Sequence, residues 1–349
     1  MRVLVTGHQG YLGSVMVPVL REAGHEVVGL DSGLFSECLL GPAPVEPPAI
    51  DVDLRDVTTA QLEGFDAVVH LAALSNDPLG ALDPSITYEI NHRASVRLAR
   101  LAKDAGVRRF LYASTCSVYG SAGTELVTEN APLRPLTPYA ESKVRVEADV
   151  AAIADSGFSP VFLRNATAFG FSPRLRADIV LNNLVASAVL TGRVRVLSDG
   201  TPWRPLVHAR DIAAVFGRAL VAPIDRVHCA AYNVGTETNN VTVAQIADAV
   251  AEAVPGSEVV ITGESGPDPR SYRVDFSAMR KAFGDNAVRW TVPEGAAELY
   301  SAYLAYGMTG DAFAHRYTRL AHLEKLRKHG LVDGTLRVQR DPHPVAPGG

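Results

Sequence analysis

Tyr139 and Lys143 stand four residues apart in the stretch Tyr139-Ala140-Glu141-Ser142-Lys143. On a helix, this spacing places both side chains on one face. A lysine ammonium beside a tyrosine lowers the pKa of the phenol towards neutrality, so that Tyr139 takes a proton from an alcohol as a hydride leaves. The spacing alone is common on solvated helices, so this acid/base hypothesis needs support from other residues.

A run of small hydroxyl residues precedes this pair. The apolar stretch that ends in Tyr112-Ala113-Ser114 continues into Thr115-Cys116-Ser117. Ligands of α/β proteins lie at the carboxyl ends of strands, so Thr115 is expected to hydrogen-bond the reacting oxygen. A helix cap or a turn is the alternative for such residues. Cys116 is either a reactive nucleophile or a buried inert thiol, and the second interpretation is favoured.

The amino-terminal stretch Gly7-His8-Gln9-Gly10-Tyr11-Leu12-Gly13 follows an apolar run and opens a predicted helix. Its glycines allow a backbone to approach a ligand closely, and the helix amides attract a diphosphate. A tight strand-to-helix turn is the alternative. Asp31 ends the second predicted strand and is placed to accept hydrogen bonds from an adenosine ribose. Its charge repels a 2′-phosphate, and neither Ser32 nor Gly33 supplies a positive charge, so NAD is favoured over NADP.

Two further stretches fall where the adenine and the middle of a dinucleotide lie in such a fold. They are Asp51-Val52-Asp53-Leu54-Arg55-Asp56 and His70-Leu71-Ala72-Ala73. His70 is interpreted as a hydrogen-bonded residue near a strand end rather than as a catalyst.

Alternating strands and helices must position these residues. Buried parallel strands are predicted at residues 2–6, 26–30, 67–72, 109–114 and 161–164, and helices at 12–23, 85–105 and 139–154. This alternation predicts a Rossmann-type, doubly wound α/β sheet. Residues 32–50 contain four prolines and are predicted to form a loop.

After about Gly170 the pattern changes to helices at 179–190, 241–254 and 293–306 and strands at 194–197 and 258–262. We expect a dinucleotide-binding domain at 1–170, with a contribution from about 204–240. A smaller substrate-binding α/β lobe is expected at 171–203 and 241–335, and a mobile tail at 336–349.

Composition excludes several classes of protein. The net charge of −5 argues against nucleic-acid binding, which usually requires a basic surface. The three cysteines lack CxxC spacing, which fits a reducing cytoplasm, and no metal site is predicted. The chain has neither a signal-peptide pattern nor the roughly 18 uninterrupted apolar residues of a membrane-spanning helix.

The glycine triplet, Asp31, the HLAA stretch, STCSVYG and YAESK occur in this order, and together they resemble the extended short-chain dehydrogenase/reductase superfamily in its nucleotide-sugar epimerase/dehydratase branch. The resemblance makes Thr115, Tyr139 and Lys143 the catalytic set. It implies NAD contacts from Gly7, Gln9, Gly10, Tyr11, Leu12, Gly13, Asp31, Ser32, Asp53, Leu54, Leu71, Ala72, Ala73, Asn91, Tyr139 and Lys143.

The resemblance extends to the substrate. Asn182-Asn183-Leu184 is similar to a segment in which the second Asn meets the diphosphate of the sugar nucleotide, which selects Asn183. Arg204 resembles an arginine that pairs with that diphosphate. Arg270 stands in the stretch 267–275, which resembles a later nucleotide-binding segment. Pro205 departs from the usual acidic residue, and the nearby Arg273 leaves the register of Arg270 open. Ser75, Thr115, Cys116 and Ser117 complete the expected sugar contacts.

The resemblance also bears on the reaction. Sugar 4,6-dehydratases carry an Asp-Glu pair directly after the catalytic threonine, where this chain has Cys116 and Ser117, so dehydration is disfavoured. Thr167-Ala168-Phe169-Gly170 and the stretch 173–179 resemble UDP-glucuronate 4-epimerases, in which Thr167 and Arg176 would hold the sugar carboxylate. Phe171-Ser172 and a missing second proline depart from that pattern, so a uronic acid and a modified hexose both stay open.

The leading hypothesis is therefore an NAD-dependent nucleoside-diphosphate-sugar epimerase that acts at C4 through a 4-keto intermediate. The alternatives are a reductase of a nucleotide-linked 4-keto sugar and, in a different class, a non-catalytic NAD-binding regulatory protein. Helices at 91–105 and 139–154 resemble those that pair in a four-helix homodimer interface. Neither nucleic acid nor a membrane is an expected partner.

Overall fold

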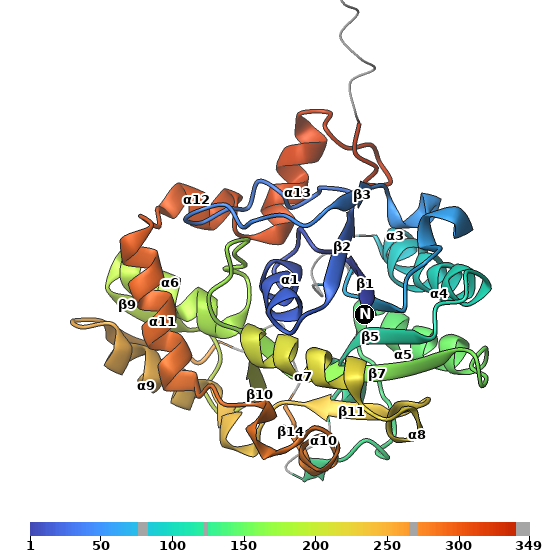
Figure 1. The fold of residues 1–349 in the computed structure, drawn as a ribbon. Coiled ribbons are helices and arrows are strands. Elements are labelled where there is room, and N and C mark those ends of the chain that lie inside the picture. Colours follow the sequence, from blue (N-terminus) through green and yellow to red (C-terminus); the bar gives the residue numbers. More distant parts are fainter. Residues whose placement is uncertain (76–82, 122–124, 265–270, 340–349) are drawn as a thin grey trace, which may run out of the picture.

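The computed structural model describes residues 1–75, 83–121, 125–264 and 271–339. Its centre is a parallel seven-stranded sheet in the order β11-β7-β5-β4-β1-β2-β3 (Figure 1). The strands are β1 (Arg2–Thr6), β2 (Glu26–Asp31), β3 (Ala49–Asp51), β4 (Ala67–His70), β5 (Arg109–Thr115), β7 (Ser159–Asn165) and β11 (Ala231–Val234). The chain reverses its direction of winding between β1 and β4, which is the point at which such sheets bind ligands. The predicted Rossmann-type fold is confirmed.

Helices cover both faces of this sheet. α1 (Gly13–Glu22) and α7 (Ala209–Val221) pack on one face, where Met16 and Phe216 are fully buried. α4 (Ser95–Asp104) and α5 (Pro138–Ala151) pack on the other, with Leu98 and Val146. Because both faces are covered, the strands are continuous apolar runs rather than alternating ones. Only the carboxyl edge of the sheet remains for a ligand.

Three details differ from the sequence expectation. β4 ends at His70, not at residue 72, so Leu71 and Ala72 belong to the following loop. The helix expected at 85–105 is divided into α3 (Pro84–Thr87), a π-helical turn at Tyr88–Ala94 and α4. The loop expected at 32–50 ends in β3, whose short run of paired residues carries too little periodicity to be recognised.

A second lobe has its own core. α6 (Val180–Thr191), α9 (Val243–Ala253) and α11 (Val292–Ala305) pack around β9 (Arg193–Val196) and β13 (Glu258–Ile261), which pair in parallel. Between the lobes, β10 (Trp203–His208) pairs with β8 (Thr167–Phe169) and β12 (Asn240–Thr242). The chain then returns to the main sheet through α7 and β11.

The shorter elements complete the description. They are β6 (Leu126–Val127), β14 (Arg273–Val274), α8 (Ile224–Val227), α10 (Ser277–Phe283) and the single turns at Leu54–Asp56, Thr59–Leu62, Cys116–Tyr119, Glu237–Asn239 and Asp285–Ala287. Within the described ranges, every helix is too short or too polar to cross a membrane.

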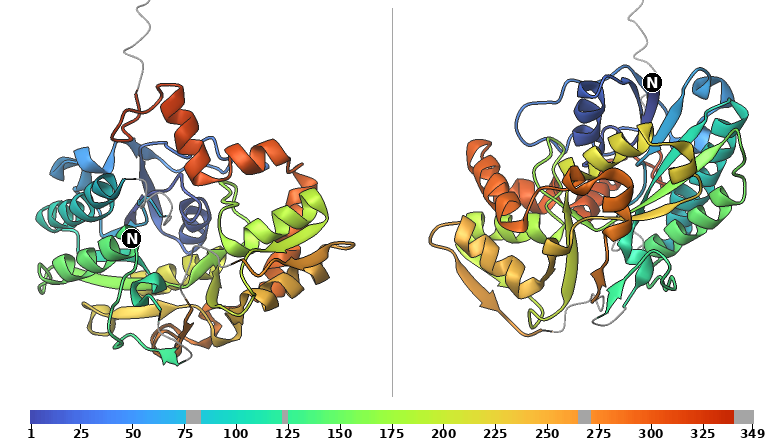
Figure 2. Two further views of the ribbon diagram at one scale, coloured as in Figure 1. Left: turned by 180° about the vertical axis from the view of Figure 1, so that it is seen from behind. Right: turned by 60° about the horizontal axis from the view of Figure 1, so that its bottom comes forward.

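The C-terminal part folds back over the dinucleotide-binding half. α12 (Gly310–His315) and α13 (Arg319–Lys328) lie beside the loop that follows β2 (Figures 1 and 2). Leu323 and Leu336 share a small core with Leu74 and Ile86. The expected tail boundary at 336 is therefore too early, because Leu336 is buried and the described chain continues to Gln339.

Candidate active site

A cavity of about 1130 Å³ lies at the carboxyl ends of the strands and reaches into the second lobe. Most of the residues expected from the sequence line it. They are Gly7, Gly10, Tyr11, Leu12, Gly13, Asp31, Ser32, Asp53, Leu54, Leu71, Ala72, Ala73, Ser75, Thr115, Ser117, Tyr139, Lys143, Thr167, Arg176, Asn183 and Arg204. Gln9, Asn91 and Cys116 are not on its wall, and Arg270 lies outside the described residues.

The glycine-rich turn fits a dinucleotide. Gly7 has a φ of +76°, and a Cβ there would lie 2.8 Å from the amide nitrogen of Ala72. A Cβ on Gly13 would lie 2.1 Å from the carbonyl oxygen of Gly7. These positions therefore require glycine, because the turn packs directly against the loop after β4 and against itself. Leu12 and Gly13, at the start of α1, line the cavity, and a helix N-terminus in this position attracts a diphosphate.

Asp31 closes this turn at the end of β2. Its two carboxylate oxygens accept hydrogen bonds of 2.9 Å from the backbone amides of Gln9 and Gly33. Gln9 thus acts through its main chain, which explains why it is close to the site without lining it. The carboxylate is held in a fixed orientation on the cavity wall, as ribose recognition requires.

Asp53 and Arg55 form the neighbouring wall. The Arg55 Nε and Nη2 atoms donate to the two carboxylate oxygens of Asp53 at 2.8 and 2.6 Å. Burial acts to raise the pKa of Asp53, but the hydrogen bonds and charge of Arg55 outweigh it and lower that pKa. The guanidinium is neutralised by this pair, so it does not reverse the preference for NAD that was expected from Asp31.

Asn91 supports the site from behind. Its side chain donates to the carbonyl oxygen of Leu74 and accepts from the Leu74 amide, at 3.0 and 2.8 Å. The π-helical turn at Tyr88–Ala94 brings this amide to the loop, and such turns are frequent at functional sites. Asn91 therefore positions the loop of Leu71, Ala72 and Ala73 rather than lining the cavity.

The expected acid/base pair, Tyr139 and Lys143, lies by the end of β5, which β4 and β1 separate from β2 and Asp31. Tyr139 and Lys143 are on the first turns of α5, which Thr137 caps by accepting from the Ala140 amide. The Lys143 Nζ lies 5.7 Å from the centre of the Tyr139 ring and donates to the carbonyl oxygen of Ala113 at 2.8 Å. Burial lowers the pKa of Lys143 to about 7, and Glu147 opposes this shift.

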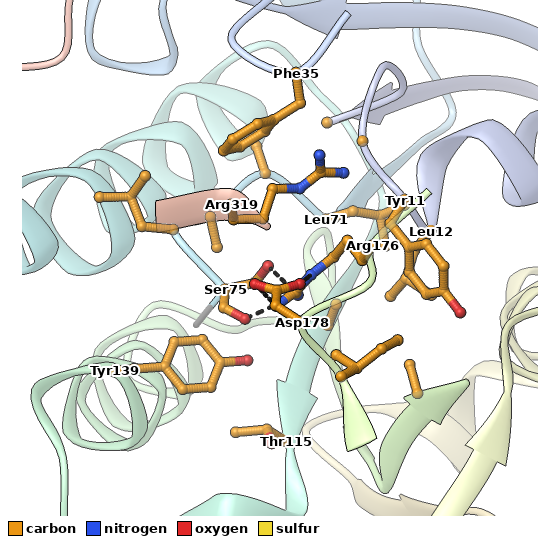
Figure 3. A pocket seen from close by; sticks show the side chains of 18 of the residues that line it. Tyr11, Leu12, Phe35, Leu71, Ser75, Thr115, Tyr139, Arg176, Asp178 and Arg319 are labelled. Atoms are coloured by element: carbon orange, nitrogen blue, oxygen red, sulfur yellow. Dashed lines mark hydrogen bonds and ion pairs between the residues drawn. The ribbon is translucent and has the colours of Figure 1, made fainter. Parts of the chain in front are cut away.

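Thr115 ends β5 beside this pair. Its hydroxyl accepts a hydrogen bond of 3.1 Å from the Ser117 amide, which orients it. Figure 3 shows the side chains of Tyr139 and Thr115 on the same side of the cavity, with the phenol oxygen directed inward. The arrangement suits a substrate hydroxyl held between the two.

Cys116 and His70 have structural roles. Cys116 is fully buried, and its thiol donates to the carbonyl oxygen of Arg164 at 3.1 Å. Burial raises the pKa of this thiol, so no thiolate forms near neutral pH. Both ring nitrogens of His70 are hydrogen-bonded, to Thr6 at 2.6 Å and to Ser95 at 2.8 Å. Burial and the nearby Lys143 lower the pKa of His70 to about 3, which keeps it neutral.

Arg176 occupies the middle of the cavity wall. Its Nε and Nη2 atoms donate to the two carboxylate oxygens of Asp178 at 2.9 and 3.2 Å, and Nη1 donates to Ser75 Oγ and O at 3.0 Å (Figure 3). Burial acts to lower the pKa of Arg176, but Asp178 outweighs it and raises that pKa. The Nε–Nη2 edge of the guanidinium, with which an arginine binds a carboxylate, is therefore already occupied by Asp178.

The remaining expected substrate residues line the second-lobe side. The Asn183 side chain donates to the carbonyl oxygen of Ala177 at 3.0 Å, and Arg204 Nη1 donates to that of Trp203 at 2.9 Å. Both hold local backbone while they line the cavity. Thr167 is at the start of β8 on the same wall.

Sequence reasoning missed several wall residues. Phe35, Asp178, Arg319 and Leu336 line the cavity, and none was expected to. Asp178 stands in the same short stretch as Arg176 and is visible in principle as a neighbouring carboxylate. Arg319 and Leu336 carry no local signal, because only the folding back of the C-terminal part brings them to the glycine-rich turn.

The doubly wound sheet, the glycine cradle, the Asp31 carboxylate and the Tyr139–Lys143 pair define a dinucleotide-dependent enzyme of the short-chain type. Residues 3–235 match the model of the NAD-dependent epimerase/dehydratase family. The chain belongs to this family, and its cofactor is NAD. The cradle that only glycine fits and the fixed Asp31 agree with that cofactor.

Two similar proteins of known name are UDP-glucose 4-epimerases. The chain is 30% identical over 286 residues to the UDP-glucose 4-epimerase of Bacillus subtilis (strain 168), covering 74% of this chain and 84% of that protein. It is 30% identical over 328 residues to UDP-glucose 4-epimerase 4 of Oryza sativa subsp. japonica, covering 85% and 87%.

Solved structures share the fold. MoeE5 in complex with UDP-glucose and NAD has a TM-score of 0.75 at 29% identity, covering 87% of this chain and 99% of that one. The UDP-glucose 4-epimerase of Stenotrophomonas maltophila with bound NAD and formylated UDP-arabinopyranose has a TM-score of 0.76 at 26% identity, covering 87% and 98%. Both are matched almost completely, so part of the present chain has no counterpart in them.

Proposed function

We propose that this protein is a nucleoside-diphosphate-sugar epimerase that inverts C4 through a 4-keto intermediate. The observation that carries the proposal is the placement of Tyr139, Lys143 and Thr115 at one end of a single cavity, with the glycine cradle and Asp31 at the other. A cofactor held by that cradle extends towards Tyr139. The named relatives, which are UDP-glucose 4-epimerases, support the same reaction and a UDP-sugar.

The residues of this chain account for the proton chemistry. NAD, when bound, supplies the hydride acceptor and donor. Tyr139 takes the proton of the C4 hydroxyl while Thr115 holds the same oxygen by a hydrogen bond. The Lys143 ammonium, fixed by Ala113, stabilises the phenolate. The keto sugar then turns within the cavity, so that the hydride returns to the other face of C4. Tyr139 gives the proton back to the C4 oxygen, so one acid/base serves both directions.

The site lacks the groups that a dehydration would use next to the catalytic threonine. Loss of water needs a further acid and base at the positions of Cys116 and Ser117. Cys116 is buried with a raised thiol pKa and does not face the cavity. A serine hydroxyl is a weak acid and a weak base. We therefore prefer epimerisation to dehydration.

For the sugar, we propose a neutral hexose rather than a uronic acid. Every nitrogen of the Arg176 guanidinium already donates to Asp178 or Ser75. A sugar carboxylate at this position would stand beside the Asp178 carboxylate, and like charges in a buried site repel strongly. A neutral hydroxyl can instead accept or donate beside this pair without that cost.

The test is to incubate the purified protein with UDP-glucose, UDP-galactose, UDP-N-acetylglucosamine and UDP-glucuronate and to analyse the products by NMR. We expect interconversion of a neutral pair of C4 epimers without net consumption of NAD. Tyr139→Phe should slow it by about 10²- to 10⁴-fold, the range for loss of one general acid/base. Tyr306→Phe, on an exposed tyrosine away from the cavity, is the control.

Two outcomes would replace the proposal. Stoichiometric consumption of NADH with a 4-keto sugar would identify a reductase that releases its cofactor at each turnover. The absence of any sugar conversion by the wild type would favour a non-catalytic NAD-binding protein. Unchanged conversion in Tyr139→Phe would contradict the acid/base role of Tyr139.

We further propose a homodimer that pairs the helices at 91–105 and 139–154 with those of a second copy. The support is their resemblance to the paired helices of this superfamily and their position side by side on one face of the molecule. Light scattering after size-exclusion chromatography tests it. A mass of 37.2 kDa, that of one chain, would contradict the dimer.

A further inference from the structure

Arg319, the first residue of α13, is a buried cation on the cavity wall. Its exposed fraction is 3%, and its Nη1 atom has no hydrogen-bond partner in the described chain. Nη2 makes one long bond of 3.4 Å, to the carbonyl oxygen of Arg174. Among the described residues, no carboxylate lies within ion-pair distance of the guanidinium.

Burial of this kind destabilises the charged form of the Arg319 guanidinium. A buried guanidinium that lacks a counter-ion loses its hydration without an electrostatic return. Arg319 lies over the Phe35 ring at 4.3 Å, which offsets only part of that loss. Burial lowers the pKa of Arg319; Cys38 opposes this effect, the like charge of Arg176 adds to it, and the more weakly acting Asp178 carboxylate opposes it. Because Asp178 already pairs with Arg176, the local charge is one cation in excess.

The position of the guanidinium identifies the anion that would balance it. In Figure 3 the Arg319 side chain extends into the space bounded by Phe35, Leu71 and Leu12. Leu12 belongs to the glycine-rich turn whose amides open α1, and Leu71 to the loop that packs on Gly7. A dinucleotide held by this turn places its diphosphate over the first amides of the helix. The guanidinium fork suits the oxygens of a phosphate.

We propose that Arg319 binds the diphosphate of NAD opposite the α1 amides, so that the C-terminal helix closes the cofactor site. The family model ends at residue 235, so this contact comes from a part of the chain outside it. The inference rests on NAD binding and does not depend on which sugar the enzyme converts.

The segment that follows α13 is anchored next to the adenosine end of the cavity. Arg55 Nη1 donates to the carbonyl oxygen of Thr335 at 2.9 Å, and Arg337 forms an ion pair with Asp56. Leu336, between these two contacts, is buried and lines the cavity. The C-terminal part therefore contributes to both the proposed diphosphate region, through Arg319, and the wall beside Asp53, through residues 335–337.

The experiment measures binding rather than activity. Full-length protein, freed of nucleotide by charcoal, is titrated calorimetrically with NAD, ADP-ribose, adenosine and UDP. Arg319→Gln should weaken the binding of NAD and of ADP-ribose by about 10- to 100-fold, which is the effect of losing a charge-assisted hydrogen bond. The affinities for adenosine and UDP should change by less than about twofold. Arg319→Lys should retain part of the NAD affinity, and Lys328→Gln, an exposed cation on the same helix, should match the wild type.

The stability of the nucleotide-free protein separates a binding role from a structural one. If the role of Arg319 is to bind an anion, Arg319→Gln leaves the midpoint of thermal unfolding unchanged or raises it, because a buried unpaired charge is removed. A lowered midpoint with equal losses for all four ligands would show a structural role and overturn the proposal. A change of NAD affinity below about twofold, or a larger loss for UDP than for NAD, would overturn it as well.

Discussion

The Lys143 Nζ atom donates a hydrogen bond of 2.8 Å to the carbonyl oxygen of Ala113, which joins α5 to β5 directly behind the reacting end of the cavity. Burial lowers the pKa of this lysine from 10.5 to about 7. Between these values the unfolded chain binds a proton that the folded protein does not, so the free energy of unfolding should rise with pH from about 7 to 10.

We expect Lys143→Met to remove this rise, because methionine keeps much of the side-chain volume without a titrating group. Urea unfolding of the nucleotide-free protein at pH 7 and pH 9 measures it. Lys325→Met, on an exposed lysine of α13, should keep the slope of the wild type. An identical slope in Lys143→Met would contradict the lowered pKa.

Asp31→Asn should weaken NAD binding by about tenfold. Both oxygens of the carboxylate accept hydrogen bonds, from the Gln9 and Gly33 amides. In asparagine, an NH₂ group replaces one oxygen and cannot accept from either amide, so one hydrogen bond is lost. Because the negative charge is also lost, the ratio of the NADP dissociation constant to that of NAD should fall. Calorimetric titrations with both nucleotides test this, with Asp311→Asn, an exposed carboxylate, as the control. A constant ratio would mean that Asp31 does not face the ribose.

Cysteine labelling tests whether Cys116 is inert. Cys38 and Cys116 are buried and Cys229 is exposed, so the native protein should react with one equivalent of a thiol reagent and the urea-unfolded protein with three. Cys229→Ser should abolish the native reaction. Cys116→Ala should change the rate of sugar conversion by less than about threefold. Rapid labelling of Cys116 in native Cys229→Ser, assigned by peptide mass spectrometry to distinguish it from Cys38, would contradict the inert thiol.

Asp178→Asn should shift the substrate preference towards a uronic acid. The substitution leaves an amide oxygen to accept from Arg176 but removes the charge that now balances the guanidinium. We expect the ratio of kcat/KM for UDP-glucuronate to that for UDP-glucose to rise by about tenfold, as a charge-assisted bond to the substrate replaces the internal one. An unchanged ratio would place the sugar ring away from Arg176.

Glu147 and Arg164 form a buried ion pair of 2.6 Å behind the site, and Ser114 donates to the same carboxylate at 2.5 Å. Glu147→Gln leaves the Arg164 guanidinium buried without its counter-ion, so it should lower the free energy of unfolding by about 3–5 kcal/mol. Glu141→Gln on the same helix, which breaks the exposed pair with Arg145, should cost about 0–1 kcal/mol. Equal losses from the two substitutions in urea unfolding would contradict this account.

Local patterns were sufficient for the first half of the fold. The five predicted strands of the main sheet lie within two residues of the observed ones, because a strand that is buried on both faces must be apolar throughout and ends where polar residues begin. The other two strands of this sheet, β3 and β11, were not recognised. Elements whose burial depends on distant partners were harder. β8 and β10 pair with each other across the junction of the lobes, and their short runs carry no period of their own.

The same division applies to the site. Spacing on one helix or one turn placed Tyr139 with Lys143 and Gly7 with Gly13, because neighbours along a regular element are neighbours in space. Long-range contacts were not accessible in this way. Arg176 donates to Ser75 only because the fold brings the loop after β4 to it. The Cys116 thiol points into the core, where it donates to the carbonyl oxygen of Arg164.

The sequence by itself determined the fold class, the glycine-rich turn and the pairing of Tyr139 with Lys143 on one helix, since each depends on residues within one element or on the order of elements. The tertiary structure alone decided which charges meet. It joined Arg176 to Ser75, buried the Cys116 thiol against the carbonyl oxygen of Arg164, and brought Arg319 from the C-terminal helix to the cavity that the glycine-rich turn lines. Such contacts join residues far apart in the chain, and only the packing of the complete fold specifies them.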